Sequence, residues 1–351
     1  MKELVGFFVA RHLRLSNNST EERYNRANYG MEIQGLSIDN GLVILQNVDV
    51  SAKTSSYSVY GRNIHQMNVT LSNFKNQVYL QYVDYISFQD NTLSNKLTFY
   101  DVGRNGGPII ASGNTFLIPN SNIDALYAYL RYTRGIVSIT KNTIIGASMN
   151  LRSSSYATVI VEDNVIRGSR RFALSAETSS TSESNMIVRN NLIQDCIPSS
   201  MVIVHLIANN QLQFENNTII DNIANNNAIF FLESRSSSAA SKFIFSGNSV
   251  ENNIAKTNLV AIHKYPLASF TKNILVNNTA PLSVKLSGMS GFSEESPTIS
   301  MPMNYWGKFQ EDVMGHRLTV EDGFHNLDHR CVIDFNTVLN GTSINRYDLS
   351  F

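Results

Sequence analysis

One phrase recurs along the chain, Ile139-Thr140-Lys141-Asn142-Thr143-Ile144, in which an asparagine stands between apolar residues. Its clearest further copies are Val161-Glu162-Asp163-Asn164-Val165-Ile166, Val188-Arg189-Asn190-Asn191-Leu192-Ile193, Phe214-Glu215-Asn216-Asn217-Thr218-Ile219 and Phe245-Ser246-Gly247-Asn248-Ser249-Val250. Weaker copies centre on Asn47, Asn68, Asn91, Asn114, Asn273 and Asn304. The roughly eleven copies lie about 21 to 31 residues apart, a period typical of solenoid repeats.

The columns of this alignment each predict a physical role. Apolar residues three and five positions before the asparagine alternate with polar ones, which indicates a strand with one buried face. Another apolar column follows two residues after the asparagine, so the chain re-enters the core after a very short corner. Asparagine suits that corner because it tolerates the left-handed conformation and because its amide can bond to the asparagines of neighbouring coils. Four residues after the asparagine, turn-forming residues predict a second corner, at Asn95, Gly146, Gly168, Asp195, Asp221, Asn252 and Asn277.

The sequence therefore predicts an all-β fold, a right-handed parallel β-helix of about eleven coils with an asparagine ladder. We expect the solenoid over residues 33–307, with an N-terminal cap or linker over 1–32 and a C-terminal cap over 308–351. The predicted structural residues are Asn142, Asn164, Asn191, Asn217, Asn248 and, as a core plug after the last copy, Trp306. A leucine-rich repeat shares part of the phrase, but it would be dominated by leucine at a more constant spacing.

Composition argues against several classes of function. Twenty-eight basic residues balance twenty-eight acidic ones, so we expect no nucleic-acid partner and no membrane contact from this segment. Asparagine makes up about 12% of the chain, which the repeat explains. Two cysteines form neither a disulfide framework nor a structural zinc site. The donors His316, Asp322, His325, Asp328 and His329 match no familiar metal spacing, and we expect no metal and no cofactor.

The repeat resembles the right-handed parallel β-helix superfamily, which has the pectin-lyase-like fold and includes lyases, hydrolases, phage tailspikes and adhesins. The end of the chain carries a second resemblance. Asn304-Tyr305-Trp306-Gly307, followed by Arg330-Cys331-Val332-Ile333-Asp334-Phe335, is similar to the closing coil of β-helix blocks in the bark beetle (Anakonda) family of animal cell-junction proteins. That family implies one extracellular block of a larger membrane protein, so we expect this chain to be a fragment of something longer.

A catalytic reading of the outward strand positions rests on Glu162, Arg189 and Glu215, which fall on successive coils. Two coil spacings place the carboxylates roughly 9.6 Å apart, at the upper limit for an inverting glycosidase. The simpler interpretation is an exposed ion-pair ladder worth a fraction of a kcal/mol per pair. We favour the latter, because the chain has no Asp-Asp pair or Gly-His-Gly phrase of the polygalacturonase type.

Two surfaces are candidates for binding. Alternation in Tyr127-Ala128-Tyr129-Leu130-Arg131 points Tyr127, Tyr129 and Arg131 outward, and Tyr79 belongs to the matching strand two coils earlier. Three other strands read as apolar on both sides, which predicts a covered face near Ile203, Phe231 and Ile262.

From these patterns and resemblances we expect a non-enzymatic extracellular block that acts as a rigid spacer and binding face in cell adhesion or junction assembly. Its partner would be another protein or a neighbouring domain of the same larger protein, with glycans as a further possibility. The alternative is a secreted polysaccharide lyase or glycoside hydrolase, in which Glu162, Arg189 and Glu215 would be catalytic.

Overall fold

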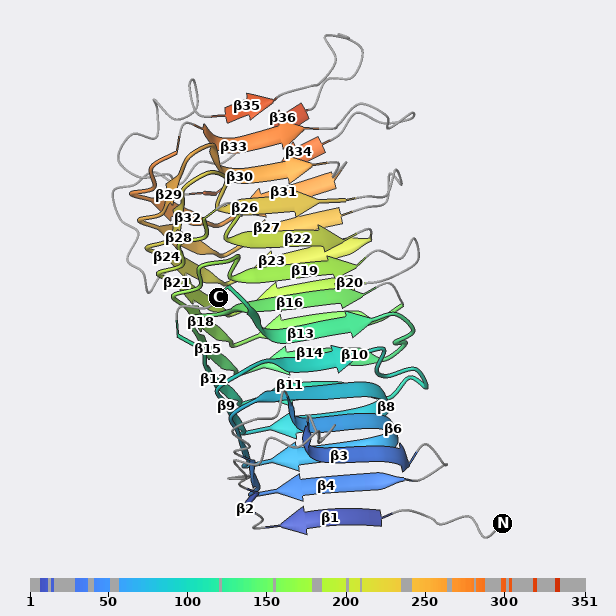
Figure 1. Ribbon diagram of the computed structural model, residues 1–351. Helices are drawn as coiled ribbons and strands as arrows, with labels where there is room; N and C mark the ends of the chain where they lie inside the picture. The colour runs from blue at the N-terminus through green and yellow to red at the C-terminus, as the bar shows by residue number, and fades with distance from the viewer. Residues whose placement is uncertain are drawn as a thin grey trace.

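The molecule is a parallel β-helix whose coils stack along one axis (Figure 1). The structure, a computed structural model, describes residues 7–11, 14–15, 29–36, 41–50, 57–119, 122–153, 156–178, 185–199, 202–208, 210–234, 242–263, 267–280, 282–287, 298–300, 303–304, 318–320 and 332–334. All the strands paired in the sheets of this part of the chain are parallel, and the predicted all-β solenoid is confirmed.

Each coil contributes strands to three stacks. The first stack ends at the asparagine corner and contains β1 (Phe7–Arg11), β4 (Leu42–Gln46), β6 (Tyr57–Thr70), β8 (Gln77–Gln89), β11 (Ile109–Ser112), β14 (Ile136–Thr140), β17 (Thr158–Glu162), β20 (Asn185–Arg189), β23 (Gln211–Glu215), β27 (Lys242–Ser246), β31 (Leu267–Thr271), β34 (Thr298–Ser300) and β36 (Val332–Asp334).

The second stack follows that corner with very short strands. It contains β2 (Arg14–Leu15), β5 (Asp49–Val50), β7 (Asn73–Phe74), β9 (Thr92–Leu93), β12 (Thr115–Leu117), β15 (Thr143–Ile145), β18 (Val165–Arg167), β21 (Leu192–Gln194), β24 (Thr218–Ile220), β28 (Ser249–Glu251) and β32 (Ile274–Val276). These eleven strands agree with the number of coils that the repeat predicts.

The third stack follows the second corner. Its strands are β3 (Tyr29–Leu36), the first halves of β6 and β8, β10 (Leu97–Tyr100), β13 (Asp124–Leu130), β16 (Ser148–Ser153), β19 (Leu174–Thr178), β22 (Val204–Ala208), β26 (Phe230–Glu233), β30 (Asn258–His263), β33 (Leu282–Ser287) and β35 (Leu318–Val320). A two-residue pair, β25 (Ile223–Ala224) with β29 (Ile254–Ala255), lies beside the second corner.

Parallel pairing extends past both ends of the solenoid predicted at 33–307. At the N-terminal end β1 pairs with β4, and at the C-terminal end β35 and β36 pair with β33 and β34. The predicted limits came from the asparagine column, whereas pairing needs only an extended backbone in register. The paired strands therefore extend further along the chain than the asparagine column from which the limits were predicted.

The asparagine ladder is confirmed over nine consecutive coils. Each side-chain Nδ2 donates to the Oδ1 of the next asparagine at 2.8 to 3.1 Å, and the main-chain N–H donates to the same oxygen. The members are Asn91, Asn114, Asn142, Asn164, Asn191, Asn217, Asn248, Asn273 and Asn304, none more than 2% exposed. Their amides satisfy one another where water is excluded.

The predicted reason for asparagine at this corner is wrong in one respect. The left-handed residue is the one before the ladder asparagine, for example Lys141, Asp163, Asn190 or Gly247, with φ between 56° and 66°. The ladder position therefore selects asparagine for its donors and acceptor, not for its backbone. At the second corner the predicted residues Gly146, Gly168, Asp195, Asp221, Asn252 and Asn277 do have positive φ.

A second, shorter ladder lies one residue after the second corner. Asn222 Nδ2 donates to Asn253 Oδ1 and Asn253 Nδ2 donates to Asn278 Oδ1, at 2.9 and 3.0 Å. Cys196 heads the same column, and its main-chain N–H donates to Asn222 Oδ1. Both corners therefore use one device, a left-handed residue followed by a ladder asparagine.

Two of the weaker predicted copies are out of register. The ladder column passes through Val48 and Ser72, because the Val48 N–H donates to Ser72 Oγ and the Ser72 N–H donates to Asn91 Oδ1. Asn47 is instead the left-handed corner residue, and Asn68 lies within β6. At Ser72 the hydroxyl oxygen accepts the main-chain N–H of the preceding coil, as the amide oxygen of a ladder asparagine does.

The core fills the inside of the coils with aliphatic and aromatic side chains at alternate positions of the strands, such as Leu212 and Phe214 on β23. The rings of Phe214, Phe245 and Phe270 stack along the axis, with centroids 5.2 and 4.5 Å apart and nearly parallel planes. All three side chains are fully buried. A stack of this kind fixes the register of successive coils, since a slip of one residue would turn each ring to the outside.

Candidate functional site

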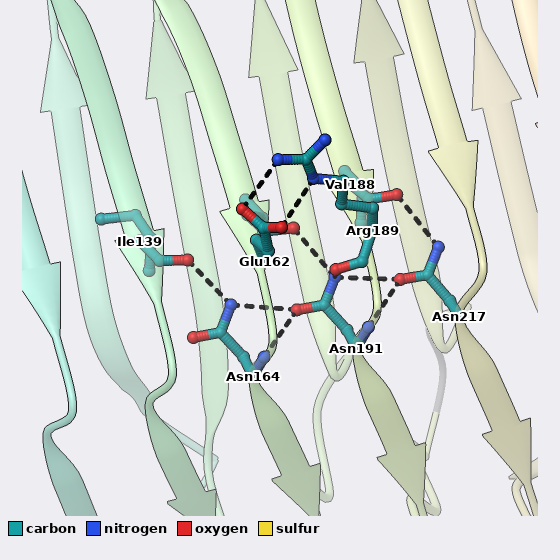
Figure 2. A network of polar contacts seen from close by, with 8 residues as sticks. Ile139, Glu162, Asn164, Val188, Arg189, Asn191 and Asn217 are labelled. Atoms are coloured by element: carbon teal, nitrogen blue, oxygen red, sulfur yellow. Dashed lines mark hydrogen bonds and ion pairs between the residues drawn. The ribbon is translucent and has the colours of Figure 1, made fainter.

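The outward row of the first stack brings Glu162, Arg189 and Glu215 together as predicted, in direct register on β17, β20 and β23. Arg189 binds Glu162 through two contacts, Nε to Oε1 at 2.8 Å and an Nη nitrogen to Oε2 at 3.1 Å (Figure 2). Ser246 donates to Glu215 Oε1 at 3.3 Å. Hydrogen bonding to Glu162 raises the pKa of Arg189. Both oxygens of Glu162 are thus held by the arginine that separates it from Glu215, which makes one exposed ion pair between adjacent coils.

A different surface carries an extended aromatic array, on the outward side of the third stack. In register, Tyr60, Tyr79, Thr98 and Tyr127 form one column, and Arg62, Gln81, Tyr100, Tyr129 and Arg152 form the next. The predicted outward direction of Tyr127 and Tyr129 is confirmed, because both are half-buried between fully buried neighbours on β13. Tyr79 lies two coils earlier in the column of Tyr127, as predicted.

The rings of this array contact one another from coil to coil. Tyr60 and Tyr79 stack with centroids 5.5 Å apart and planes at 6°, and Tyr79 stacks on Tyr100 at 6.3 Å. Tyr100 meets Tyr129 at 5.2 Å, and Tyr57 meets Tyr60 edge to face at 5.9 Å. Five tyrosines therefore form a continuous row along the solenoid axis, on strands β6, β8, β10 and β13.

Arginines extend the row around the end of these strands. The guanidinium of Arg131 lies over the rings of Tyr129 and Tyr132, and that of Arg104 lies over Tyr132 and Tyr82 at 5.1 and 4.2 Å. Arg62 lies over the other end of this series, 5.7 Å from the Tyr82 ring centre. We call the whole array the Tyr–Arg ladder: Tyr57, Tyr60, Arg62, Tyr79, Tyr82, Tyr100, Arg104, Tyr129, Arg131 and Tyr132.

Burial and stacking tune the ionisation of this surface. Burial, followed by repulsion from neighbouring tyrosines, raises the pKa of Tyr79 to about 12. Hydrogen bonds to Tyr129 and Tyr132 raise the pKa of Arg131. The phenol of Tyr79 consequently stays neutral and the guanidinium of Arg131 stays charged through the physiological pH range.

A polar cluster borders the ladder where the same strands begin. Asp124, 5% exposed, accepts hydrogen bonds from Arg171 at 3.1 Å and from Ser148 at 2.8 Å. Lys96 lies 4.4 Å from the Tyr127 ring centre, and burial lowers its pKa. Burial likewise raises the pKa of Tyr127. Because Arg171 and Ser148 both bind the carboxylate of Asp124, this cluster adds little accessible negative charge beside the Tyr–Arg ladder.

The predicted apolar face needs correction. Ile203 and Ile262 are fully buried in the main core, and only Phe231 of the three faces outward. Ile203 precedes β22, where strand alternation does not yet apply, and Ile262 shares an inward column with Leu232. Phe231 packs on a small cluster with Val202, Ala228 and Ala261 and lies near the ring of His205.

Other sequence-based candidates lie outside the described residues: Trp306, and the donors His316, Asp322, His325, Asp328 and His329. In the part of the chain that the structure describes, no three His, Cys, Asp or Glu side chains gather as a metal site would require. The same residues include no helix with the length and apolar character needed to span a membrane.

Sequence reasoning found two tyrosines of the ladder, Tyr79 and Tyr129, together with Arg131, and missed Tyr57, Tyr60, Tyr82, Tyr100 and Tyr132. The missing signal was register: Tyr60 stands twelve residues before Ser72, as Tyr79 stands twelve before Asn91. An alignment centred on Asn68 hides that match. Arg104 was not recoverable from alternation, because it lies after its strand, in a turn.

Comparison with known proteins adds no family to these observations, since no family model, curated protein or solved structure matches this chain.

Proposed function

We propose that the chain is a non-enzymatic extracellular block of a larger cell-surface protein, a rigid spacer and binding face in cell adhesion or junction assembly. The observation that supports this most is the Tyr–Arg ladder, a continuous row of half-buried tyrosines and exposed arginines on the sheet surface. Solenoids use such long side faces for binding. Tyrosine and arginine are also enriched among the residues that dominate protein interfaces.

Rigidity supports the spacer role. The coils are tied together by main-chain pairing in three stacks, by the asparagine ladder and by the phenylalanine stack. Each device contacts only the adjacent coils, so the length of the molecule grows with coil number while its cross-section stays constant. A face built on such an array keeps a fixed spacing between its side chains.

The similarity of the C-terminal phrase to bark beetle (Anakonda) blocks supports the cellular setting. The phrase begins at Asn304, which accepts from Asn273 as a member of the asparagine ladder. In this proposal it closes one block of several in a protein of epithelial cell contacts. The extracellular location follows from the same similarity.

The carbohydrate-active alternative has less support, because Arg189 holds both carboxylate oxygens of Glu162. A general acid must bring a carboxyl oxygen to the leaving oxygen of the substrate, and in this structure both oxygens of Glu162 contact the guanidinium of Arg189. A glycan screen with and without calcium separates the two functions. Turnover that disappears in Glu162→Gln would overturn the non-enzymatic proposal.

The binding role is tested by attachment of epithelial cells to surfaces coated with the full chain. We expect several-fold lower attachment to Tyr100→Ser/Tyr129→Ser, which removes two rings from the centre of the ladder. Tyr156→Ser is the matched control, since Tyr156 is 60% exposed and lies outside the ladder. Unchanged attachment to the double variant would contradict the proposal.

A further inference from the structure

The Tyr–Arg ladder presents edges and not ring faces to a ligand. Tyr60 and Tyr79 cover each other, Tyr79 also covers Tyr100, and Arg104 lies between the rings of Tyr82 and Tyr132. A guanidinium stacked on a ring keeps its N–H donors at the edge, where they can bind carboxylates in a forked geometry. The outer rim of the ladder is therefore a row of hydroxyl groups and guanidinium donors.

Positive charge is concentrated on this surface, although the whole chain has a formal net charge of zero. Arg62, Arg104, Arg131 and Arg152 are all exposed. The carboxylates among them are withdrawn: Asp101 is 2% exposed and lies 3.4 Å from Arg104, while Asp124 is held by Arg171.

Two acidic residues mark the ends of this basic surface. Glu32 lies in the coil before Tyr60, and Glu177 lies in the coil after Arg152, both in the ladder's own columns. Between them run the five coils of β6, β8, β10, β13 and β16. At about 4.8 Å per coil these span roughly 19 Å, the length of about six residues of extended chain.

We infer that the Tyr–Arg ladder binds an acidic protein segment, about six residues long and extended along the solenoid axis, whose carboxylates contact Arg62, Arg104, Arg131 and Arg152. The inference rests on the proposed function and names the chemistry of the partner. Charge complementarity provides the attraction, and the row of phenol hydroxyls provides hydrogen bonds to the segment's main chain.

The stacking geometry favours a peptide over a polysaccharide. Sugars bind aromatic residues by lying on an open ring face, and in this ladder neighbouring rings and guanidiniums occupy those faces. A peptide needs no open ring, because its side-chain carboxylates and main-chain groups bond to edges. A polysaccharide ligand is accordingly a contrary outcome of the test below.

The test measures binding of fluorescein-labelled octaglutamate to the full chain by fluorescence anisotropy. We expect saturable binding that weakens with added salt, and about tenfold weaker binding to Arg104→Gln/Arg131→Gln through the loss of two charge contacts. The matched control is Arg167→Gln/Arg189→Gln, which removes two exposed arginines from the other stacks. We expect less than a twofold change there. Thermal unfolding verifies that each variant is folded, and Arg62→Gln with Arg152→Gln replaces the ladder variant if that variant does not fold.

Three results would overturn the inference. One is no binding of octaglutamate to the parent chain, and another is an equal loss of affinity in the ladder and control variants. The third is a heparin octasaccharide that binds through the same arginines at least tenfold more tightly than octaglutamate. If the tyrosine variant loses cell attachment while octaglutamate fails to bind, the proposed function stands and this inference alone fails.

Discussion

Two ladders run along the axis of this solenoid. Both depend on the stacking of coils, but one lies in the core and the other on the surface. The asparagine ladder is buried, and each member donates to and accepts from its neighbours. The Tyr–Arg ladder is half-buried to exposed and is held by ring and cation–π contacts. A coil spacing of about 4.8 Å brings identical side chains into contact in both cases. In the core, water is excluded and each polar atom needs a partner within the protein. On the surface, water can serve as a partner, so the edges of the tyrosine rings and guanidiniums remain accessible to a ligand.

The largest effect should come from the inner ladder, in Asn191→Ala. The change removes the acceptor of two buried donors of Asn164, its main-chain N–H and its Nδ2. Each orphaned buried donor costs about 1 to 3 kcal/mol, so we expect a loss of about 3 to 5 kcal/mol. Denaturant unfolding measures it, with the exposed Asn122→Ala as a control that should change by less than about 0.5 kcal/mol. A similar small change in Asn191→Ala would show that the ladder does not stabilise the coils.

In the shorter asparagine ladder at the second corner, we expect a substitution that increases the stability of the fold. Cys196 occupies the position of a ladder asparagine before Asn222, and burial raises the pKa of its thiol to about 12. In Cys196→Asn the new amide would donate to Asn222 Oδ1 and to the Ile166 carbonyl, as Asn222 donates to Asn253 and Ile193. We expect unfolding to become about 1 kcal/mol less favourable. Cys196→Ala, which removes the thiol and adds no amide, is the control, and equal stabilities of the two variants would sink the idea.

The asparagine ladder was predictable from sequence because its members are chemically unique and recur beside two apolar columns. The repeat alone predicts Asn142, Asn164, Asn191, Asn217 and Asn248, and all five are members of the ladder. What the pattern did not separate was the left-handed residue from the ladder residue one position later, since asparagine is common at both.

The Tyr–Arg ladder was only partly predictable for a different reason. Alternation tells which side of a strand a residue faces, and it correctly turned Tyr127 and Tyr129 outward. It cannot tell which residues of different coils touch, because coil lengths vary and the column at Ser72 lacks its asparagine. The prediction that Ile203 faces outward was wrong for a related reason. Ile203 precedes β22, and alternation does not predict the direction of a residue before its strand begins.

The outer ion pair of Glu162 and Arg189 tests how much an exposed contact contributes. Arg189 is 46% exposed at its side chain, so screening by water reduces the pair to below about 1 kcal/mol. A double-mutant cycle with Glu162→Gln and Arg189→Gln measures the coupling, and we expect it to shrink in high salt. A coupling above about 2 kcal/mol that does not change with salt would show that this exposed pair contributes to stability as much as the contacts of the buried ladder.

The smallest expected effect lies in the alkaline stability of the Tyr–Arg ladder. The pKa of Tyr79 is raised from 10.0 to about 12 in the folded protein, so the folded state holds this proton between about pH 10 and 12 while the unfolded chain releases it. Stability that is fully present below pH 10 is therefore lost as the pH rises through 12. In Tyr79→Phe no such proton exists, and the melting temperature should fall less steeply over this interval. Water screening limits the difference, because the side chain is only half-buried. Tyr156→Phe removes an exposed phenol outside the stack and provides the comparison; identical slopes in the two variants would show that stacking in the outer ladder does not alter the ionisation of Tyr79.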